Sequence, residues 1–144
     1  MTTKQEWLLI ALAHRRGQVM TPAQIQKAMF LMRMEAAAYV GDRFYDFIPY
    51  NYGPFDAAVY HDLDDLAEKG LVTGGALPGR SWKVYAVTPA GIEAAAQARQ
   101  AADGTALGYL ERVVDWVSSM SFPALIRSIY EKYPDFKVNS VFVG

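Results

Sequence analysis

The chain has no cysteine among its 144 residues. This absence excludes a disulfide framework, thiol chemistry, and zinc or iron–sulfur sites with cysteine ligands. An excess of one charge is also lacking, because 14 lysines and arginines nearly balance 15 aspartates and glutamates and leave a net charge of −1. The composition therefore gives no global attraction to nucleic acid or to an anionic membrane surface.

Long hydrophobic runs are missing as well. No segment reaches the roughly 18 apolar residues expected of a membrane-spanning helix. The N-terminal sequence MTTKQEWLLIALAHRRG has a short apolar run followed by its basic residues, so we expect no signal peptide, no membrane association and a cytoplasmic protein. The length fits one domain, 1–144, with a core at about 3–100 and a C-terminal helical extension at about 105–134.

Histidine is scarce, with only His14 and His61 present. Neither lies near a nucleophile motif such as G-x-S-x-G, so the sequence predicts no catalytic residues. His61 and Asp65 have the spacing of two metal ligands on one helix, but a solvated acidic face explains them without a metal. The glycine-rich stretch 74–79 lacks the Lys-Ser/Thr of a P-loop and precedes an expected strand. We therefore expect a protein that is not an enzyme and holds no metal or cofactor.

Helix start signals recur along the chain. The sequences TKQE at residue 3 and TPAQ at residue 21 have the spacing of a capping box, in which two side chains satisfy backbone N–H groups at the helix start. They predict one helix that ends before Gly17 and a second, strongly apolar helix that ends at Gly41. The next residues, 41–54, contain two prolines and two glycines, and we expect an irregular or partly extended connection there.

A third helix is expected from about Pro54 to Lys69. Its hydrophobic residues recur every three or four positions and predict one buried face. They are Phe55, Val59, Leu63 and Leu66. Asp62 lies at the flank of this face, where we expect a cationic or hydrogen-bonding partner, because an unpaired carboxylate would be destabilising there.

The following residues predict a β-hairpin, in which Leu71–Thr73 pairs with Trp82–Val87. A fourth helix begins at the TPAG sequence after this hairpin and ends before Asp103. Two further helices are expected, one with an apolar stripe between Leu107 and Val117 and one that starts at Ser121. The expected fold is mostly α with a small β-hairpin (α+β), a winged helix-turn-helix with extra C-terminal helices.

The segment 47–72 contains three sequence patterns that are more specific than helix periodicity. The sequence YGPF at residues 52–55 is followed by the pattern Val59-Tyr60-x-Asp62-Leu63 and by KGLV at residues 69–72. This segment resembles the Panacea (SocA-like) antitoxin domains and the related YwgA-like winged-helix proteins. The resemblance implies an antitoxin or adaptor that holds a partner protein, such as a toxin, a protease or a chaperone.

Six aromatic residues lie between Phe44 and Phe55, a high density for a loop. Tyrosine combines a large apolar area with a polar tip and is enriched at interface hot spots. We expect a partner surface made of some of these tyrosines and of the acidic side of the third helix. The residues are Tyr45, Tyr50, Tyr52, Asp64, Asp65 and Glu68. Packing of the loop between two helices is the other interpretation of the same aromatic residues.

The alternative function is a DNA-binding transcription regulator. Such a regulator would contact DNA phosphates with Arg15 and Arg16 at the end of the first helix. It would also use Arg80 and Lys83 in the wing, which is the β-hairpin and its loop. The regulator would form a homodimer through the last two helices. The acidic third helix argues against DNA binding, because a helix against phosphates needs positive charge.

Overall fold

A computed structural model describes residues 2–76, 79 and 83–143. This part of the chain is mostly helical, with seven α-helices and two small antiparallel hairpins, which confirms the predicted α+β class. The elements are α1 (Lys4–His14), α2 (Pro22–Glu35), α3 (Ala37–Val40), β1 (Ile48–Tyr50), β2 (Gly53–Phe55), α4 (Ala57–Glu68), β3 (Val72–Ala76), β4 (Lys83–Val87), α5 (Pro89–Ala101), α6 (Gly104–Ser118), α7 (Phe122–Lys132) and the 3₁₀-helix η1 (Pro134–Lys137). None of the helices in the described part is long and apolar enough to cross a bilayer.

The predicted helix starts are confirmed by their caps. Thr3 and Thr21 each form a complete capping box with the residue three positions later. Thr88 and Ser121 accept a hydrogen bond from the backbone N–H three residues on, and each is followed within two positions by a proline. The second helix is shorter than expected, because α2 ends at Glu35 and the short α3 follows it.

Residues 41–54 are partly extended, which is one of the two expected states of this segment. Strand β1 pairs with β2, so that Pro49 lies opposite Pro54 and Tyr50 lies opposite Gly53. Two prolines are tolerated because each strand of an isolated hairpin has a free edge, where a missing N–H breaks no ladder bond. Asp56 caps α4, so Phe55 belongs to β2 and not to the buried face of the helix.

The second hairpin forms as predicted, and its far end is held by a close junction with α5. The backbone N–H of Thr88 donates to the Leu71 carbonyl at 3.0 Å. A Cβ atom on Gly91 would lie 1.9 Å from that same carbonyl oxygen, so only glycine fits in this first turn of α5. Met20, in the connection between α1 and α2, forms a bridge to Tyr85 on β4.

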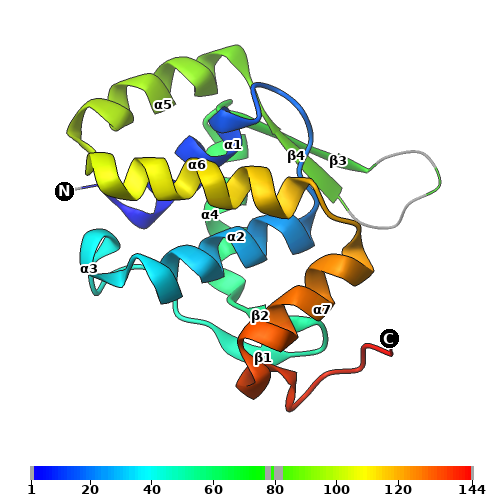
Figure 1. The fold of residues 1–144 in the computed structure, drawn as a ribbon. Helices are drawn as coiled ribbons and strands as arrows, with labels where there is room; N and C mark the ends of the chain where they lie inside the picture. Colours follow the sequence, from blue (N-terminus) through cyan, green and yellow to red (C-terminus); the bar gives the residue numbers. More distant parts are fainter. Residues whose placement is uncertain (1, 77–78, 80–82, 144) are drawn as a thin grey trace.

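One hydrophobic core joins the N-terminal and C-terminal helices. Helix α1 is central and buried from Trp7 to Leu12, and α6 packs across α1 and α2 (Figure 1). The predicted C-terminal extension is part of this core, because Leu110, Val114 and Val117 of α6 are fully buried. The apolar stripe of α6 is thus covered within the chain, and a homodimer through the last two helices stays a prediction. The winged-helix assignment and the single domain stay predictions.

Candidate functional site

Two buried polar residues of α2 fix the β1–β2 hairpin to the core. The Gln26 amide group donates to the Asp56 carbonyl at 3.0 Å and accepts the Asp56 N–H at 3.1 Å. The Asp56 carboxylate accepts further bonds from the backbone N–H groups of Ala58 and Asp46. Because each of these polar groups has a partner, the junction between β2 and α4 is a well-defined point on the scaffold.

Lys27 lies next to Gln26, beneath the hairpin. Its side chain is almost completely buried, with 4% exposed, and its Nζ atom donates to the Pro54 carbonyl across 3.5 Å. Burial lowers the pKa of Lys27 to about 8, because the charged form loses its hydration. Gly53 has a φ of +99° and lies between Lys27 and the Tyr130 ring of α7, so the hairpin turn is packed on both α2 and α7.

The hairpin presents aromatic side chains to solvent. Tyr50 and Tyr52 are 47% and 45% exposed, and Phe122 at the start of α7 is 43% exposed. Tyr50 stacks on Phe55 with 4.8 Å between ring centroids, and Tyr52 meets Phe122 edge-on at 5.4 Å. The C-terminal segment, residues 138–143, follows η1. Its Phe142 ring lies 6.3 Å from the Phe122 ring between centroids.

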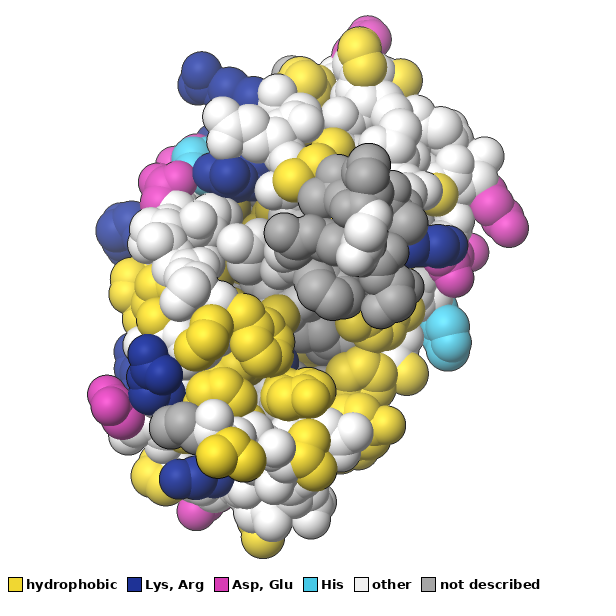
Figure 2. Space-filling model, turned by 90° about the vertical axis from the view of Figure 1, so that its right-hand side faces the viewer, with side chains coloured by type: hydrophobic (Ala, Val, Ile, Leu, Met, Phe, Trp, Pro, Cys, Tyr) yellow, Lys and Arg dark blue, Asp and Glu magenta, His cyan; other side chains and the backbone are white. Residues whose placement is uncertain are grey.

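We call these five residues, Tyr50, Tyr52, Phe55, Phe122 and Phe142, the aromatic face. Figure 2 shows hydrophobic side chains gathered over the lower half of the surface that includes the C-terminal segment. Further exposed hydrophobic residues on the same two segments are Ile48, Val138, Val141 and Val143. Hydrophobic side chains exposed together in this way typically mark an interaction site.

The C-terminal segment lies along the hairpin turn. The Val141 N–H donates to the Asn51 carbonyl at 2.9 Å, and the Asn139 amide donates to the Pro49 carbonyl at 3.3 Å. The Tyr130 hydroxyl donates to the Ser140 hydroxyl at 2.6 Å. These bonds place Phe142 beside α7 and add it to the aromatic face.

Tyr45 was expected on the partner surface, and this prediction is wrong. Its ring is fully buried, and its hydroxyl donates to the Asp62 carboxylate at 2.5 Å. Gln5 donates a second, longer bond to Asp62, so the predicted hydrogen-bonding partner of this carboxylate is confirmed. Burial, followed by the bond to Asp62, raises the pKa of Tyr45 well above its usual value.

The acidic residues of α4 are exposed as predicted, on a helix that begins directly after Phe55 of the aromatic face. Tyr60, on the same helix, is 5.8 Å from Phe55 between ring centroids. Asp64 lies one helical turn after Tyr60, and Asp65 and Glu68 follow on the solvent side. The negative charge of Asp64 also contributes, after burial, to a raised pKa of Tyr85 on strand β4.

Of the basic residues of the alternative function, the structure describes Arg15, Arg16 and Lys83. Arg16 is exposed and Arg15 is partly buried at the end of α1, whereas Lys83 is exposed at the start of β4. Arg80 lies outside the described residues. The bridge between Met20 and Tyr85 ties the connection after α1 to β4.

A groove lies beside the aromatic face, between α7, η1 and the C-terminal segment. Its volume is about 340 Å³, and Arg127, Tyr130 and Phe142 contribute to its wall. Glu131 and Lys137 also line it. The groove combines aromatic surface with two cations and one carboxylate.

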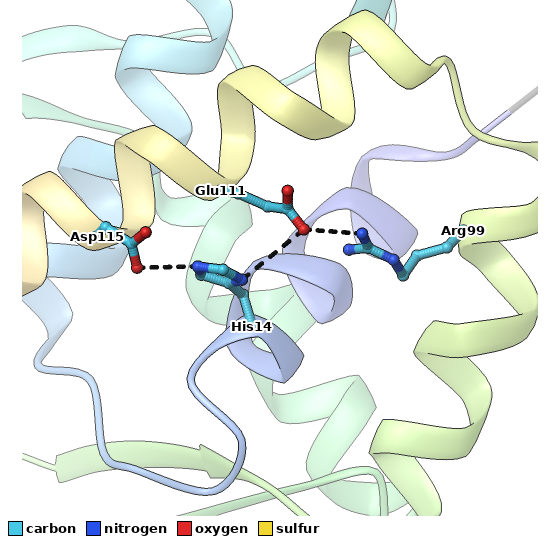
Figure 3. A network of polar contacts seen from close by, with 4 residues as sticks. All are labelled: His14, Arg99, Glu111 and Asp115. Atoms are coloured by element: carbon cyan, nitrogen blue, oxygen red, sulfur yellow. Dashed lines mark hydrogen bonds and ion pairs between the residues drawn. The ribbon is translucent and has the colours of Figure 1, made fainter.

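A separate polar network joins α1, α5 and α6 (Figure 3). The His14 ring lies 2.9 Å from a carboxylate oxygen of Asp115 and 3.9 Å from one of Glu111, and Glu111 also accepts from Arg99 at 2.8 Å. These contacts connect the end of α1 to α6 and α6 to α5. Within the described ranges, no group of three or more histidine, aspartate or glutamate residues is arranged to hold a metal ion.

Sequence reasoning missed Phe122 and Phe142 as members of the site. Phe122 has the helical spacing of the apolar stripe of α7, one turn before Leu125 and Ile126, but it is the first residue of the helix and is 43% exposed. Its spacing indicates a buried residue, so the sequence carried no signal of its exposure. Phe142 carried no signal either, because only the path of the chain after η1 brings it beside the hairpin.

Comparison with known proteins adds no family to this description. No protein-family model matches the sequence, and no curated protein matches it either.

Proposed function

We propose that this chain is a non-enzymatic protein-interaction module that binds a partner protein through the aromatic face. The observation that carries the proposal is the exposure of Tyr50 and Tyr52 on a hairpin that buried groups of α2 fix in place, together with that of Phe122 at the start of α7. Tyrosine rings on a rigid support lose little conformational entropy on binding, so they contribute strongly to affinity.

The acidic side of α4 supplies the second part of the proposed interface. Asp64, Asp65 and Glu68 continue the surface that begins at Tyr50 and passes through Phe55 and Tyr60. Exposed charges at the edge of an interface mainly steer the approach of a partner and exclude wrong ones. A partner that reaches this end of the surface carries basic residues.

The resemblance of residues 47–72 to Panacea and YwgA-like proteins supports a more specific role. In that role the chain is an antitoxin or an adaptor on a winged-helix scaffold, and its partner is a toxin, a protease or a chaperone. The order α1, α2, α4, β3, β4, α5 and the bridge from Met20 to the hairpin are compatible with such a scaffold.

The test is a calorimetric titration against the product of the adjacent gene. Tyr52→Ala and Tyr50→Ala should each weaken binding by about 2 kcal/mol, roughly thirtyfold in dissociation constant. Tyr39→Ala is the matched control, because Tyr39 is 49% exposed on α3, away from the aromatic face. Equal effects of the three substitutions, or none, would remove the aromatic face from the interface.

A charge variant tests the acidic side separately. Changing Asp64, Asp65 and Glu68 together to lysine should lower the association rate and reverse its dependence on salt, with a smaller change in dissociation rate. A change confined to the dissociation rate would place these residues inside the contact and not at its edge.

A DNA-binding regulator is the alternative. It is favoured by the bridge that joins the connection after Arg15 and Arg16 to strand β4, which begins at Lys83. Against it, α4 exposes Asp64, Asp65 and Glu68, so a duplex that contacted both α4 and the hairpin would meet negative charge.

A further inference from the structure

We infer that a second copy of this chain binds the aromatic face, in a twofold dimer centred on the turn of the β1–β2 hairpin. The inference rests on the proposed function, because it takes the aromatic face to be a protein interface. The occupant that we infer for that face is a second copy of the same chain. Any other partner then binds in competition with the second copy.

One half of the surface leads from the turn to negative charge. Tyr50 stacks on Phe55, and Phe55 lies 5.8 Å from Tyr60 between ring centroids. One helical turn beyond Tyr60 the exposed carboxylates of α4 begin, at Asp64 and Asp65. This half is therefore aromatic near the turn and acidic at its outer end.

The other half leads from the same turn to positive charge. Tyr52 meets Phe122, and Phe122 is followed by Phe142. Phe142 lines the groove that Arg127 and Lys137 also line. Neither cation forms an ion pair with a side-chain carboxylate of the residues described, and Glu131 in the groove offsets only one of the two charges.

The order along the surface is thus acidic, aromatic, aromatic, basic. A rotation of 180° about an axis through the turn reverses this order. In a twofold dimer the acidic end of each copy then meets the basic end of the other, while the tyrosines of both copies meet at the centre. A twofold interface requires a patch that is complementary to itself, and this charge pattern has that property. Buried aromatic residues at the centre with charged residues at the rim are also the usual composition of an interface.

Analytical ultracentrifugation of the full chain tests the inference directly. We expect a reversible dimer in the micromolar range that weakens as salt increases, since the rim charges are screened over about 10 Å at 0.1 M salt. Tyr52→Ala should raise the dimer dissociation constant by roughly thirtyfold or more, because each substitution acts twice in a symmetric interface. Tyr39→Ala should leave the constant unchanged.

A charge exchange tests the pairing of the two ends. Arg127→Glu with Lys137→Glu should weaken the dimer by at least about tenfold, and so should Asp64→Lys with Asp65→Lys. The variant with all four substitutions should dimerise nearly as well as the parent, because the exchanged ends are again complementary. All four positions are exposed, so thermal unfolding by circular dichroism should show an unchanged fold.

Three outcomes would overturn the inference. They are a monomer at every concentration, a dimer insensitive to Tyr52→Ala, and a charge exchange that does not restore dimerisation. The proposed function is judged by the separate titration with the adjacent gene product. A monomer that binds this product through Tyr52 leaves the proposed function in place, whereas a dimer that does not bind it supports the inference alone.

Discussion

Lys27 is a buried ammonium group beneath the hairpin, with a single long hydrogen bond to a carbonyl. Its pKa is about 8 in the folded chain and 10.5 in the reference state, so between these values the unfolded chain binds more protons. The free energy of unfolding therefore rises with pH across this window. Below about pH 8 the destabilisation by the buried charge is fully present.

We predict that Lys27→Met stabilises the protein by about 1–3 kcal/mol at pH 7, since a methionine of similar length removes the buried charge. The difference between variant and parent should shrink as the pH rises from 8 towards 10.5. Urea denaturation at several pH values measures it. Lys83→Met, at an exposed position, serves as the control and should show no such pH dependence. A destabilised Lys27→Met variant would mean that the ammonium has partners beyond the Pro54 carbonyl.

A second residue-scale prediction concerns Tyr45. Tyr45→Phe removes the hydrogen bond to Asp62 and should lower the free energy of unfolding by about 1–3 kcal/mol. The pKa of Tyr45 is raised in the folded chain, so this contribution is present below about pH 10 and is lost as the pH rises above it. Tyr52→Phe, at an exposed ring, should change stability by less than about 0.5 kcal/mol. Similar values for the two variants would indicate that the Asp62 bond contributes nothing.

At the scale of the elements, the junction between β3 and α5 makes the sharpest prediction. Gly91→Ala should destabilise the protein by about 3 kcal/mol or more, because the added Cβ would overlap the Leu71 carbonyl and the backbone has to shift. Gly104→Ala is the control. It adds the same methyl group in the first turn of α6, where nothing lies within 4 Å, and should be neutral or stabilising by about 0.4–1 kcal/mol. Thermal melts of both variants measure the difference, and equal melting temperatures would show that the junction relaxes freely.

Local sequence signals predicted the elements that rest on local chemistry. The capped helix starts and the β3–β4 hairpin follow from hydrogen bonds between residues that are close in the sequence. The β1–β2 hairpin was not predicted, because its prolines indicate a break and only the support from Gln26 and Lys27, about 30 residues earlier, makes the conformation stable. Tertiary contacts decided the state of this segment.

Only some residues of the candidate site could be predicted from the sequence. Tyr50 and Tyr52 could be placed on a surface from their density and type, but Tyr45 has the same type and is buried. The difference arises from Asp62, which offers the Tyr45 hydroxyl a partner inside the fold. Phe122 and Phe142 join the site only through the path of the chain after α6.

At the scale of the whole molecule, the balance of charge predicts weak interaction with nucleic acid. Purified protein at about 0.1 M salt, where exposed charges act over roughly 10 Å, should not shift random duplex DNA at micromolar concentration. The measurement is an electrophoretic mobility assay across a series of salt concentrations. Tight binding that falls steeply with salt and is abolished by Arg80→Ala and Lys83→Ala would favour the DNA-binding alternative.

The bridge at Met20 has a consequence for aggregation. Strand β4 is buried from Val84 to Val87, and an apolar strand with a free edge is a template on which other chains can add. Met20 occupies that edge, since its backbone exchanges two hydrogen bonds with Tyr85, at 2.7 Å and 2.9 Å. The connection between α1 and α2 thus keeps concentrated protein from pairing edge to edge. Met20→Pro would remove one of the two bonds and should lower the protein concentration at which precipitation begins, relative to the parent.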